Sequence, residues 1–258
     1  MPVFIGTSGW QYRHWRDAFY PQGLPQKAWL EFYAERFQVV ELNNSFYHLP
    51  KPEFFAAWAQ RTPADFIIAA KVSRYLTHIK RLQDPAEPVA RFMENASRLG
   101  SKLGPLLLQL PPNLQVDLPA LDETLSRFPE GVRVAVEFRH PSWFTPATKS
   151  LLEDHGAACC LADRNGTPVT SIWRTTDWSF VRWHHGLSRP PPCYRRKDMT
   201  EWAQRIAGLW EPREDVYAFF NNDPRGCALR DACVFAQEAE VEGLRPTRVP
   251  ARKEVKIV

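Results

Sequence analysis

VRVAVEFRHPSW, residues Val132–Trp143, combines the pattern of a buried strand with charged side chains at its end. Its first five residues alternate valine with other residues, and β-branched side chains in such alternation are typical of a strand. Glu137 and Arg139 follow on one face, because side chains two residues apart in a strand share a face. Pro141 then ends the ladder, since proline has no N–H to donate. Charges at the end of a core strand are costly, so the stretch predicts a functional site at this end of a sheet.

The length and composition fit one folded globular domain. The chain has 258 residues, of which 44% are hydrophobic and 24% charged, and both fractions are ordinary for such a domain. A net charge of +4, from 33 basic and 29 acidic residues, does not by itself indicate nucleic acid. No apolar run approaches the ~20 residues that cross a membrane, and the N-terminus lacks the pattern of a signal peptide. We therefore expect a cytoplasmic protein without membrane contact.

The cysteines form no recognisable metal or redox motif. There are five, an odd number, and no C-x-x-C pair occurs. Two of them lie in an apolar run that reads as a strand, where a thiol packs as a small apolar group. We expect reduced, buried thiols at Cys159, Cys160, Cys193, Cys227 and Cys233.

Seven further apolar runs read as strands, with helices between them. The first, Val3–Gly6, precedes a tight polar turn. The other predicted strands are Val39–Leu42, Phe66–Lys71, Leu106–Leu110, Ala157–Ala162, Ser179–His184 and Val216–Phe220. The predicted helices are Lys27–Phe37, Pro52–Arg61, Glu87–Leu99, Leu118–Phe128, Phe144–His155, a helix capped by Asp198 or Thr200 that ends near Leu209, and Gly226–Glu240.

This alternation indicates an α/β fold, a single (β/α)8 TIM-type barrel with a parallel eight-stranded core. The strands are mostly continuous apolar runs, as is typical of parallel strands covered on both faces. A doubly wound open sheet is the alternative. We expect the barrel to occupy residues 1–240 and a basic C-terminal tail to occupy residues 241–258, because much of the positive excess lies between Arg245 and Lys256.

In such a barrel the carboxyl ends of the strands form the mouth that holds the active site. The side chains predicted at this mouth are Ser8, Glu41, Asn43, Lys71, Gln109, Glu137, Arg139, Asp163, Arg182, His184, Asn221 and Asn222. An ion network that only closes the barrel would account for paired charges. So many hydrogen-bonding groups at one mouth nevertheless favour a ligand site.

The composition of this set favours an anionic ligand, because the planar guanidinium group of arginine suits phosphate or carboxylate. The predicted catalytic residues are Glu41, Lys71 and Glu137, with either glutamate as the acid or base. The predicted substrate-binding residues are Ser8, Trp10, Asn43, Tyr47, Gln109, Arg139, His140, Asp163, Arg182, His184, Asn221 and Asn222. Aromatic residues after these strands either stack on a sugar or base or pack over the barrel. They are Trp10, Tyr12, Trp15, Phe46, Tyr47 and Trp143.

Other chemistries stay open on the same residues. A lysine at the end of an apolar strand, here Lys71, suits a Schiff base. Two carboxylates, Glu41 and Glu137, suit a glycosidase. A metal site would draw on Glu137, Asp163, His184 and Asp223. The neighbouring cations would repel a metal ion, so we expect no tightly held metal and no cofactor.

Six stretches, in this order, together resemble the YecE-like family, also called domain of unknown function 72. They are Ile5–Trp10, Val40–Tyr47, Ala70–Val72, Gln109–Pro112, Val136–Trp143 and Phe219–Asn222. The resemblance implies a TIM-barrel-like fold without an established activity, distantly similar to barrels of the endonuclease IV and sugar isomerase kind. The family tends to read tyrosine, arginine and His-Gly on the seventh strand. This chain has one more residue there, and alternation from Arg182 favours His184 over His185 at the mouth.

We therefore expect an enzyme that binds an anionic or phosphorylated, sugar-containing small molecule and uses acid/base chemistry, as a hydrolase or isomerase. One alternative is a nucleic-acid-binding protein of the endonuclease IV-like barrel type, and another is a metal-dependent isomerase or hydrolase. The basic residues that support nucleic-acid binding are Arg189, Arg195, Arg196 and Lys197. If the charges at the mouth serve a ligand rather than the fold, Glu137→Gln should be about as stable as the wild type or more stable.

Overall fold

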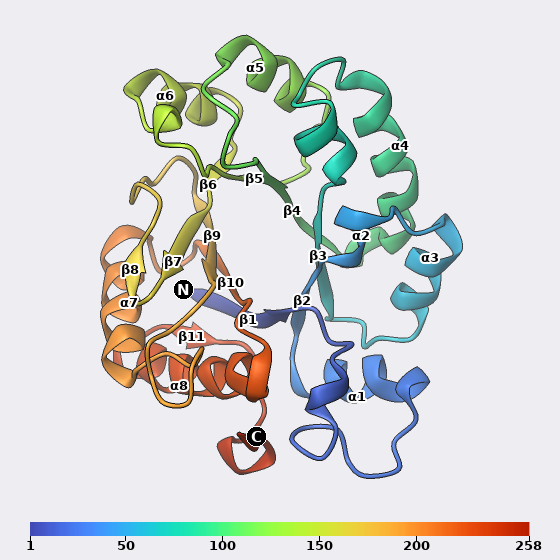
Figure 1. Ribbon diagram of the computed structural model, residues 1–258, viewed down its shortest axis with the longest axis vertical. Helices are drawn as coiled ribbons and strands as arrows, with labels where there is room; N and C mark the ends of the chain where they lie inside the picture. The colour runs from blue at the N-terminus through green and yellow to red at the C-terminus, as the bar shows by residue number, and fades with distance from the viewer. Residues whose placement is uncertain (258) are drawn as a thin grey trace.

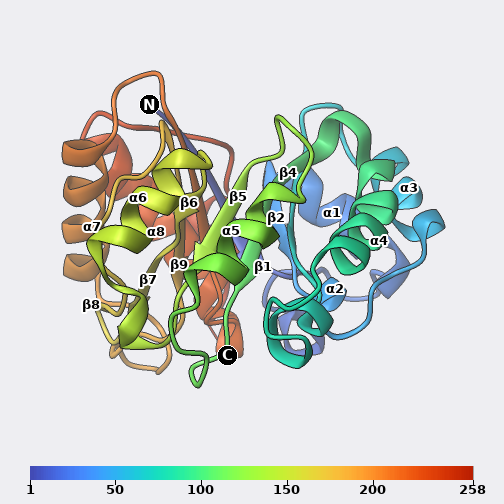
Figure 2. The ribbon, with the colours of Figure 1, turned by 90° about the horizontal axis from the view of Figure 1, so that it is seen from above.

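Strands and helices alternate along residues 1–257, the part of the chain that the computed structural model describes, and the helices form a ring around the strands (Figure 1). The strands are β1 (Pro2–Ser8), β2 (Val39–Leu42), β3 (Ile67–Lys71), β4 (Leu103–Gln109), β5 (Val134–Glu137), β6 (Ala158–Cys159), β7 (Leu161–Arg164), β8 (Thr167–Pro168), β9 (Trp178–Trp183), β10 (Asp215–Phe220) and β11 (Arg245–Pro246). The α-helices are α1 (Trp29–Arg36), α2 (Asn44–Tyr47), α3 (Pro52–Gln60), α4 (Ala86–Ala96), α5 (Leu118–Ser126), α6 (Pro146–Asp154), α7 (Arg196–Leu209) and α8 (Cys227–Val241). Seen from above, α3 and α4 lie on one side of the strands and α7 and α8 on the opposite side (Figure 2).

The predicted α/β barrel is confirmed, with one interruption in its ring of strands. The strands follow the order β6-β5-β4-β3-β2-β1-β10-β9-β7-β8, and β11 pairs with β1 at the side of this path. Neighbours along the path are parallel except β7 and β8, which form an antiparallel pair. The run predicted as one strand, Ala157–Ala162, is divided: β6 pairs with β5 and β7 pairs with β9. Only Cys160 separates β6 from β7 in the sequence. The chain therefore passes at this residue from one side of the interruption to the other.

Two threonine side chains replace ladder partners at this interruption. The backbone N–H of Cys159 donates to Thr175 Oγ1 at 2.9 Å, and that of Ala162 donates to Thr170 Oγ1 at 2.9 Å. Buried N–H groups that lack a strand partner need such acceptors. The sequence did not reveal the break because the run is apolar throughout and carries no turn residue.

Local capping fixes several helix starts. Asp117 caps α5 by accepting the N–H of Ala120 at 3.1 Å, and such a cap satisfies a donor at the helix N-terminus. The helix predicted to begin at Asp198 or Thr200 begins earlier, at Arg196, with Asp198 accepting the N–H of Arg195 at 3.0 Å.

Across residues 1–257, no helix is both long and apolar enough to cross a membrane.

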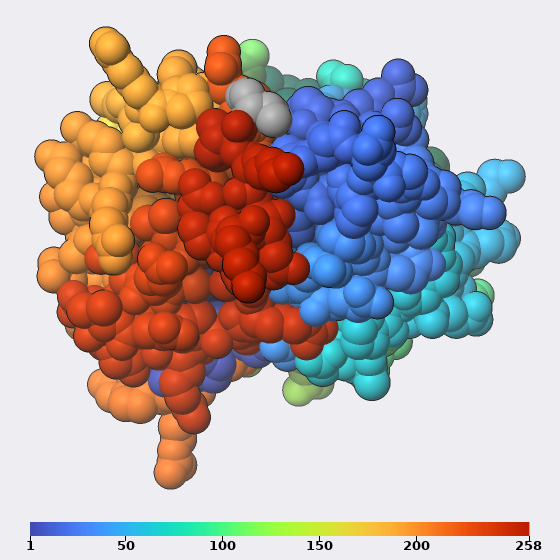
Figure 3. All heavy atoms as spheres, turned by 90° about the horizontal axis from the view of Figure 1, so that it is seen from below, coloured from blue at the N-terminus to red at the C-terminus, as the bar shows by residue number. Residues whose placement is uncertain are grey.

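The basic C-terminal segment packs against the barrel. Strand β11 pairs with β1, and the Lys256 N–H donates to Ala18 O at 2.8 Å. Arg248 forms an ion pair with Asp65, and Val255 is buried. Figure 3 shows this segment, in red, lying against the N-terminal part of the chain, in blue. The described part of the predicted tail, residues 241–257, is therefore integrated into the fold.

The prediction of five reduced thiols is wrong for two of them. Cys193 and Cys227 form a disulfide that joins the loop after β9 to the start of α8. Cys159, Cys160 and Cys233 are free and buried, as expected. The bonded pair is 34 residues apart in the sequence, and no spacing motif marks it.

Candidate functional site

The polar side chains at the mouth form a layer directly above the apolar filling of the barrel. Each lies two residues after an apolar side chain of one buried cluster, so the strand pleat places both on the inward face. The pairs are Val39 and Glu41 on β2, Ala69 and Lys71 on β3, Leu107 and Gln109 on β4, Ala135 and Glu137 on β5, Phe180 and Arg182 on β9, and Phe219 and Asn221 at the end of β10. The chain therefore converts the ends of six strands around the barrel into one polar layer.

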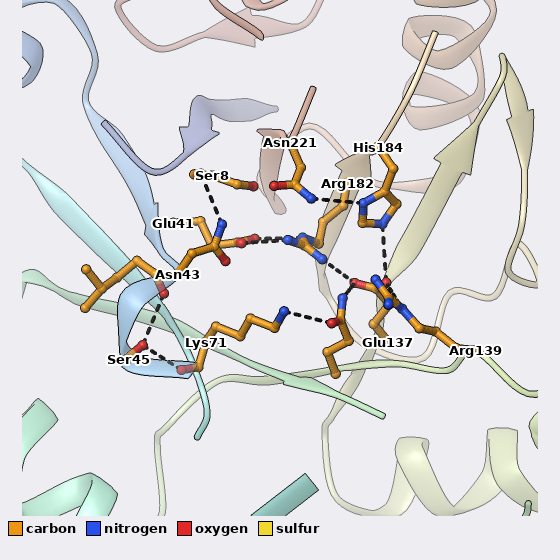
Figure 4. A network of polar contacts seen from close by, with 12 residues as sticks. Ser8, Glu41, Asn43, Ser45, Lys71, Glu137, Arg139, Arg182, His184 and Asn221 are labelled. Atoms are coloured by element: carbon orange, nitrogen blue, oxygen red, sulfur yellow. Dashed lines mark hydrogen bonds and ion pairs between the residues drawn. The ribbon is translucent and has the colours of Figure 1, made fainter. Parts of the chain in front are cut away.

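Arg182 lies at the centre of this layer (Figure 4). Its Nε and Nη2 donate to the two carboxylate oxygens of Glu41, each at 2.8 Å. Its Nη1 donates to Glu137 Oε2 at 2.6 Å. All three side chains are almost completely buried. Burial lowers the pKa of Arg182, but Glu41 and Glu137 outweigh it and hold the pKa above its ordinary value.

Glu137 is shared by several donors. Besides Arg182, its carboxylate accepts from Gln109 Nε2 at 2.9 Å and from Arg139 Nε at 3.1 Å, and His184 Nε2 lies 3.3 Å away. Burial raises the pKa of Glu137, but the nearby Arg182, His184 and Arg139 together hold it well below its ordinary value. Glu137 is therefore a fixed anion at neutral pH. The position of His184 agrees with the alternation that favoured it over His185.

Lys71 is held by neutral groups. Its Nζ donates to Gln109 Oε1 at 2.7 Å and lies 3.9 Å from the centre of the Phe46 ring. Burial lowers the pKa of Lys71 to about 7, and Arg182 adds to the shift while Glu137 and Glu41 oppose it. Ser45 Oγ donates to Lys71 O at 2.7 Å and fixes the end of β3 against α2. Lys71 is thus a buried amine that titrates near neutral pH.

A cavity of about 400 Å³ opens beside this layer. Its walls are Tyr12, Asn43, Phe46, Tyr47, Lys71, His78, Gln109, Arg139, Arg182 and Asn221. Among these side chains, all from the described part of the chain, three are cationic and none is a carboxylate. Glu41 and Glu137 do not line this cavity, although Glu137 lines the neighbouring one, so the charged side chains of this wall are basic.

Two buried oxygens beside the cavity, Ser8 Oγ and Asn43 Oδ1, lack a hydrogen-bond partner within residues 1–257. Asn43 lines the cavity, and its Nδ2 donates to Ser8 O at 3.1 Å. Asn221 Nδ2 lies 3.2 Å from His184 Nδ1. Unsatisfied buried oxygens are costly, so these atoms are suited to hydrogen bonds from a ligand.

The Arg139 guanidinium lies between two cavities. Its Nε contacts Glu137, whereas Nη1 and Nη2 make no hydrogen bond to the rest of residues 1–257. It lines the cavity beside Lys71 and also a second cavity of about 320 Å³ that includes Arg164 and His184. Nη1 and Nη2 of this guanidinium can therefore donate two hydrogen bonds to one anion.

Two predicted site residues point away from the mouth. Asp163 lies three residues after the inward-facing Cys160, and this odd spacing directs its side chain outward. Its Oδ2 accepts from Trp202 Nε1 at 2.8 Å. Asn222 follows the inward Asn221 and faces outward, where its Nδ2 donates to Asp231 Oδ2 at 2.8 Å. Both side chains stabilise the contact of strands and loops with α7 and α8.

The loop residues divide between cavity and core. Tyr12, Phe46 and Tyr47 line the cavity. The buried aromatic residues Trp10, Trp15 and Trp143 pack into the core instead. His140 caps the short helix Pro141–Trp143 by accepting the N–H of Ser142 at 3.2 Å.

The four residues considered above as metal ligands, Glu137, Asp163, His184 and Asp223, do not all lie together. Asp163 contacts Trp202, and Asp223 lies 3.6 Å from His14. In the described chain, no group of three or more His, Cys, Asp or Glu side chains is arranged to hold a metal ion.

The sequence reasoning missed His78 as a cavity residue. It lies in the helical turn Tyr75–Ile79 after β3, with Nδ1 2.8 Å from Thr77 Oγ1. Burial, then the charges of Lys71 and Arg139, lower its pKa to about 4, so it is neutral at pH 7. A lone histidine after a strand carries no pattern that could have marked it.

The hydrogen-bond partners of Glu137 lead us to expect that Glu137→Gln is less stable than the wild type, the opposite of the expectation from the sequence. The substitution removes the anion that accepts from Arg182, Gln109 and Arg139. We expect the free energy of unfolding to fall by about 1.5–3 kcal/mol, the range for hydrogen bonds to charged groups. Urea denaturation at pH 7 measures it, with the exposed Glu123→Gln as control. Equal stability of Glu137→Gln and wild type would restore the original expectation.

Comparison with known proteins agrees with the sequence resemblance. Residues 4–254 match a family model described as "Protein of unknown function DUF72". UPF0759 protein YecE of Escherichia coli strain K12 is 33% identical over 155 residues, which are 60% of this chain and 54% of that protein, so the match spans about half the length of this relative. UPF0759 protein YunF of Bacillus subtilis strain 168 is 24% identical, with 96% of this chain and 99% of that protein aligned.

Two solved structures are similar over nearly the whole chain. The crystal structure of a DUF72 family protein from Thermotoga maritima has a TM-score of 0.80 and 27% identity, covering 93% of this chain and 100% of that one. The structure of a D-psicose 3-epimerase has a TM-score of 0.53 and 12% identity, covering 94% and 96%. The second likeness concerns the fold alone.

Proposed function

We propose that this chain, which belongs to the DUF72 family, is an enzyme that binds a small anionic, sugar-containing molecule at the mouth of the barrel and exchanges a proton with it. The observation that carries the proposal is the charge of the cavity wall. Lys71, Arg139 and Arg182 line it without a carboxylate among the described residues. Cations in a partly enclosed site attract and orient an anionic ligand.

The remaining walls suit a sugar. Tyr12 and Tyr47 offer aromatic rings, which pack on the apolar faces of sugar rings. Asn43 and Asn221 provide amide groups, and Asn43 Oδ1 has no hydrogen-bond donor within residues 1–257. A ligand hydroxyl would supply that donor.

Lys71 is a better acid–base candidate than either glutamate. Both oxygens of Glu41 accept from Arg182, and Glu137 is held as an anion by three cationic or polar neighbours. The pKa of Lys71, lowered to about 7 by burial and by Arg182, lies close to neutral pH. A group with such a pKa is well suited to exchange protons with a ligand. We therefore assign proton transfer to Lys71 and structural support of Arg182 to the glutamates.

A ligand panel tests the proposal. Phosphorylated and carboxylated sugars, including ribose 5-phosphate and gluconate, are compared with their neutral parents in thermal unfolding. A binder at 100 times its Kd stabilises the fold by about 2.7 kcal/mol, or roughly 5–10 °C in Tm. We expect anionic members to reach this shift with the wild type and to lose most of it with Arg139→Ala.

Arg16→Ala provides the matched control, because Arg16 lines an unrelated cavity. It should leave the ligand-induced shift unchanged. If no anionic sugar stabilises the wild type, or if neutral parents do so equally, the proposal fails.

Nucleic-acid binding receives less support. Two of the basic residues that suggested it are paired within the chain, Arg195 with Asp198 at 2.8 Å and Arg196 with Glu238 at 2.6 Å. The neighbouring carboxylates offset part of the positive charge that phosphate contacts would need. We therefore retain the small anionic ligand as the proposed partner.

A further inference from the structure

The amine of Lys71 has the surroundings of a nucleophile. It projects from the end of β3 into the cavity, and in the described chain its hydrogen-bond acceptor is the neutral Gln109 Oε1. The Phe46 ring lies below it at 3.9 Å. A lysine paired with a carboxylate stays protonated, whereas one held by neutral groups in a buried site can lose its proton.

The charges around Lys71 act in the same direction. Burial and Arg182 lower its pKa to about 7, and Arg139 contributes in the same sense, against the opposing effects of Glu137 and Glu41. A substantial fraction of the Lys71 side chains therefore carries a neutral amine at pH 7. An amine desolvated beside another cation is an established form of activated nucleophile.

His78 provides a proton carrier in the same cavity. Its Nδ1 is engaged by Thr77 Oγ1 at 2.8 Å, which leaves Nε2 for exchange. A pKa of about 4 makes the ring a weak base, so a proton taken up at Nε2 is passed on rapidly rather than held.

Building on the function proposed above, we propose that Lys71 forms a Schiff base with an aldehyde or ketone carbonyl of the anionic ligand. The Nζ lone pair attacks the carbonyl carbon, the C=O π electrons move to the oxygen, and one Nζ proton reaches that oxygen through His78. With one proton taken from solvent, the hydroxyl leaves as water, and the remaining Nζ lone pair forms the C=N bond of an iminium ion. Atoms and electrons balance without an oxidant or reductant.

The neighbours of Lys71 suit this product. Gln109 Oε1, now 2.7 Å from Nζ, can accept the remaining iminium N–H. The Phe46 ring can stabilise the cation as it does the ammonium group. Arg139 would hold the anionic group and Asn43 Oδ1 a hydroxyl, so the ligand class is a hydroxylated aldehyde or ketone with a phosphate or carboxylate.

Reductive trapping tests the inference. The wild type is incubated with dihydroxyacetone phosphate or pyruvate and sodium cyanoborohydride at pH 7, and the modified lysines are quantified by peptide mass spectrometry. We expect at least tenfold more adduct at Lys71 than at Lys102. Lys102 is the internal control, because its pKa is also lowered by burial but its amine donates to Ala59 O and Thr62 O outside the cavity. Adduct at Lys71 no greater than at Lys102 with both probes overturns the inference.

Further arms separate this inference from the proposed function. Lys71→Arg should abolish the adduct at position 71 and leave labelling of other lysines unchanged. If glycerol 3-phosphate, which has no carbonyl, raises the Tm through Arg139 while neither carbonyl probe labels Lys71, the anion site stands and the Schiff base falls. If neutral dihydroxyacetone labels Lys71 as fast as its phosphate, the Schiff base stands and the preference for anions falls.

Discussion

Arg182→Met is expected to lower the free energy of unfolding at pH 7 by on the order of 5 kcal/mol. The substitution leaves Glu41 and Glu137 buried without the cation that donates three hydrogen bonds to them at 2.6–2.8 Å. An uncompensated buried charge is among the largest single destabilising effects in proteins. Since a domain has only about 5–15 kcal/mol of stability, the variant should be close to unfolding.

The pH dependence of the stability difference between Arg182→Met and the wild type tests whether unpaired buried carboxylates cause the loss. In the wild type, the pKa of Glu137 is held well below its ordinary value, so its contribution to stability is constant between pH 7 and 5 and is lost only in stronger acid. Without Arg182, the burial that raises the pKa of Glu137 loses its largest opposing charge, so the folded variant takes up protons more readily than the folded wild type as the pH falls. The stability gap between variant and wild type should therefore narrow from pH 7 to pH 5 in urea denaturation.

A triple variant provides the control that still reports if the single variant does not fold. Glu41→Gln, Arg182→Met and Glu137→Gln together remove all three charges, and neutral replacement of a whole buried ion network is often tolerated. We expect the triple variant to recover most of the loss. A single variant as stable as wild type, or a triple variant no better than the single one, would contradict the pairing as the main role of Arg182.

Strand alternation explains how much of this site could be predicted from the sequence. Glu41, Lys71, Glu137 and Arg182 each end an apolar run in the same phase as an interior residue, so the sequence placed them at the mouth together. Which of them pair could not be predicted, because Arg182 and Glu41 are 141 residues apart and only the pairing of β2, β1, β10 and β9 brings them to the same mouth.

Strand alternation, or its absence, also explains which residues the sequence analysis misplaced or missed. The run before Asp163 is apolar on every residue, so it does not show which side chains face inward; Ala158 and Cys160 both face inward, and the same alternation directs Asp163 toward α7. His78 enters the cavity from a helical turn, and the Cys193–Cys227 disulfide joins a loop to the first residue of α8. Such features depend on tertiary contacts between segments that have no periodic pattern of their own.

Lys71→Met is expected to have the opposite effect to Arg182→Met and to raise the free energy of unfolding at pH 7. The pKa of Lys71 is lowered to about 7 in the folded protein, by burial first and Arg182 second, whereas lysine in an unfolded chain titrates near pH 10.4. Between these values the unfolded chain binds more protons, so wild-type stability rises with pH. At about 1.36 kcal/mol per pKa unit, the rise between pH 7 and 9 is about 2 kcal/mol.

Methionine has a similar length, packs well against an aromatic ring such as Phe46, and carries no charge to desolvate. Lys71→Met should therefore exceed the wild type by about 1–3 kcal/mol at pH 7, and the difference should shrink toward pH 9. Groups common to both proteins cancel in this difference, which urea denaturation at the two pH values measures. Lys102→Met is the matched control: its amine donates to Ala59 O and Thr62 O, so its removal should destabilise the fold. If Lys71→Met also destabilises the protein and keeps the wild-type pH slope, Lys71 is a structural partner of Gln109, and its amine is not held unprotonated for a ligand.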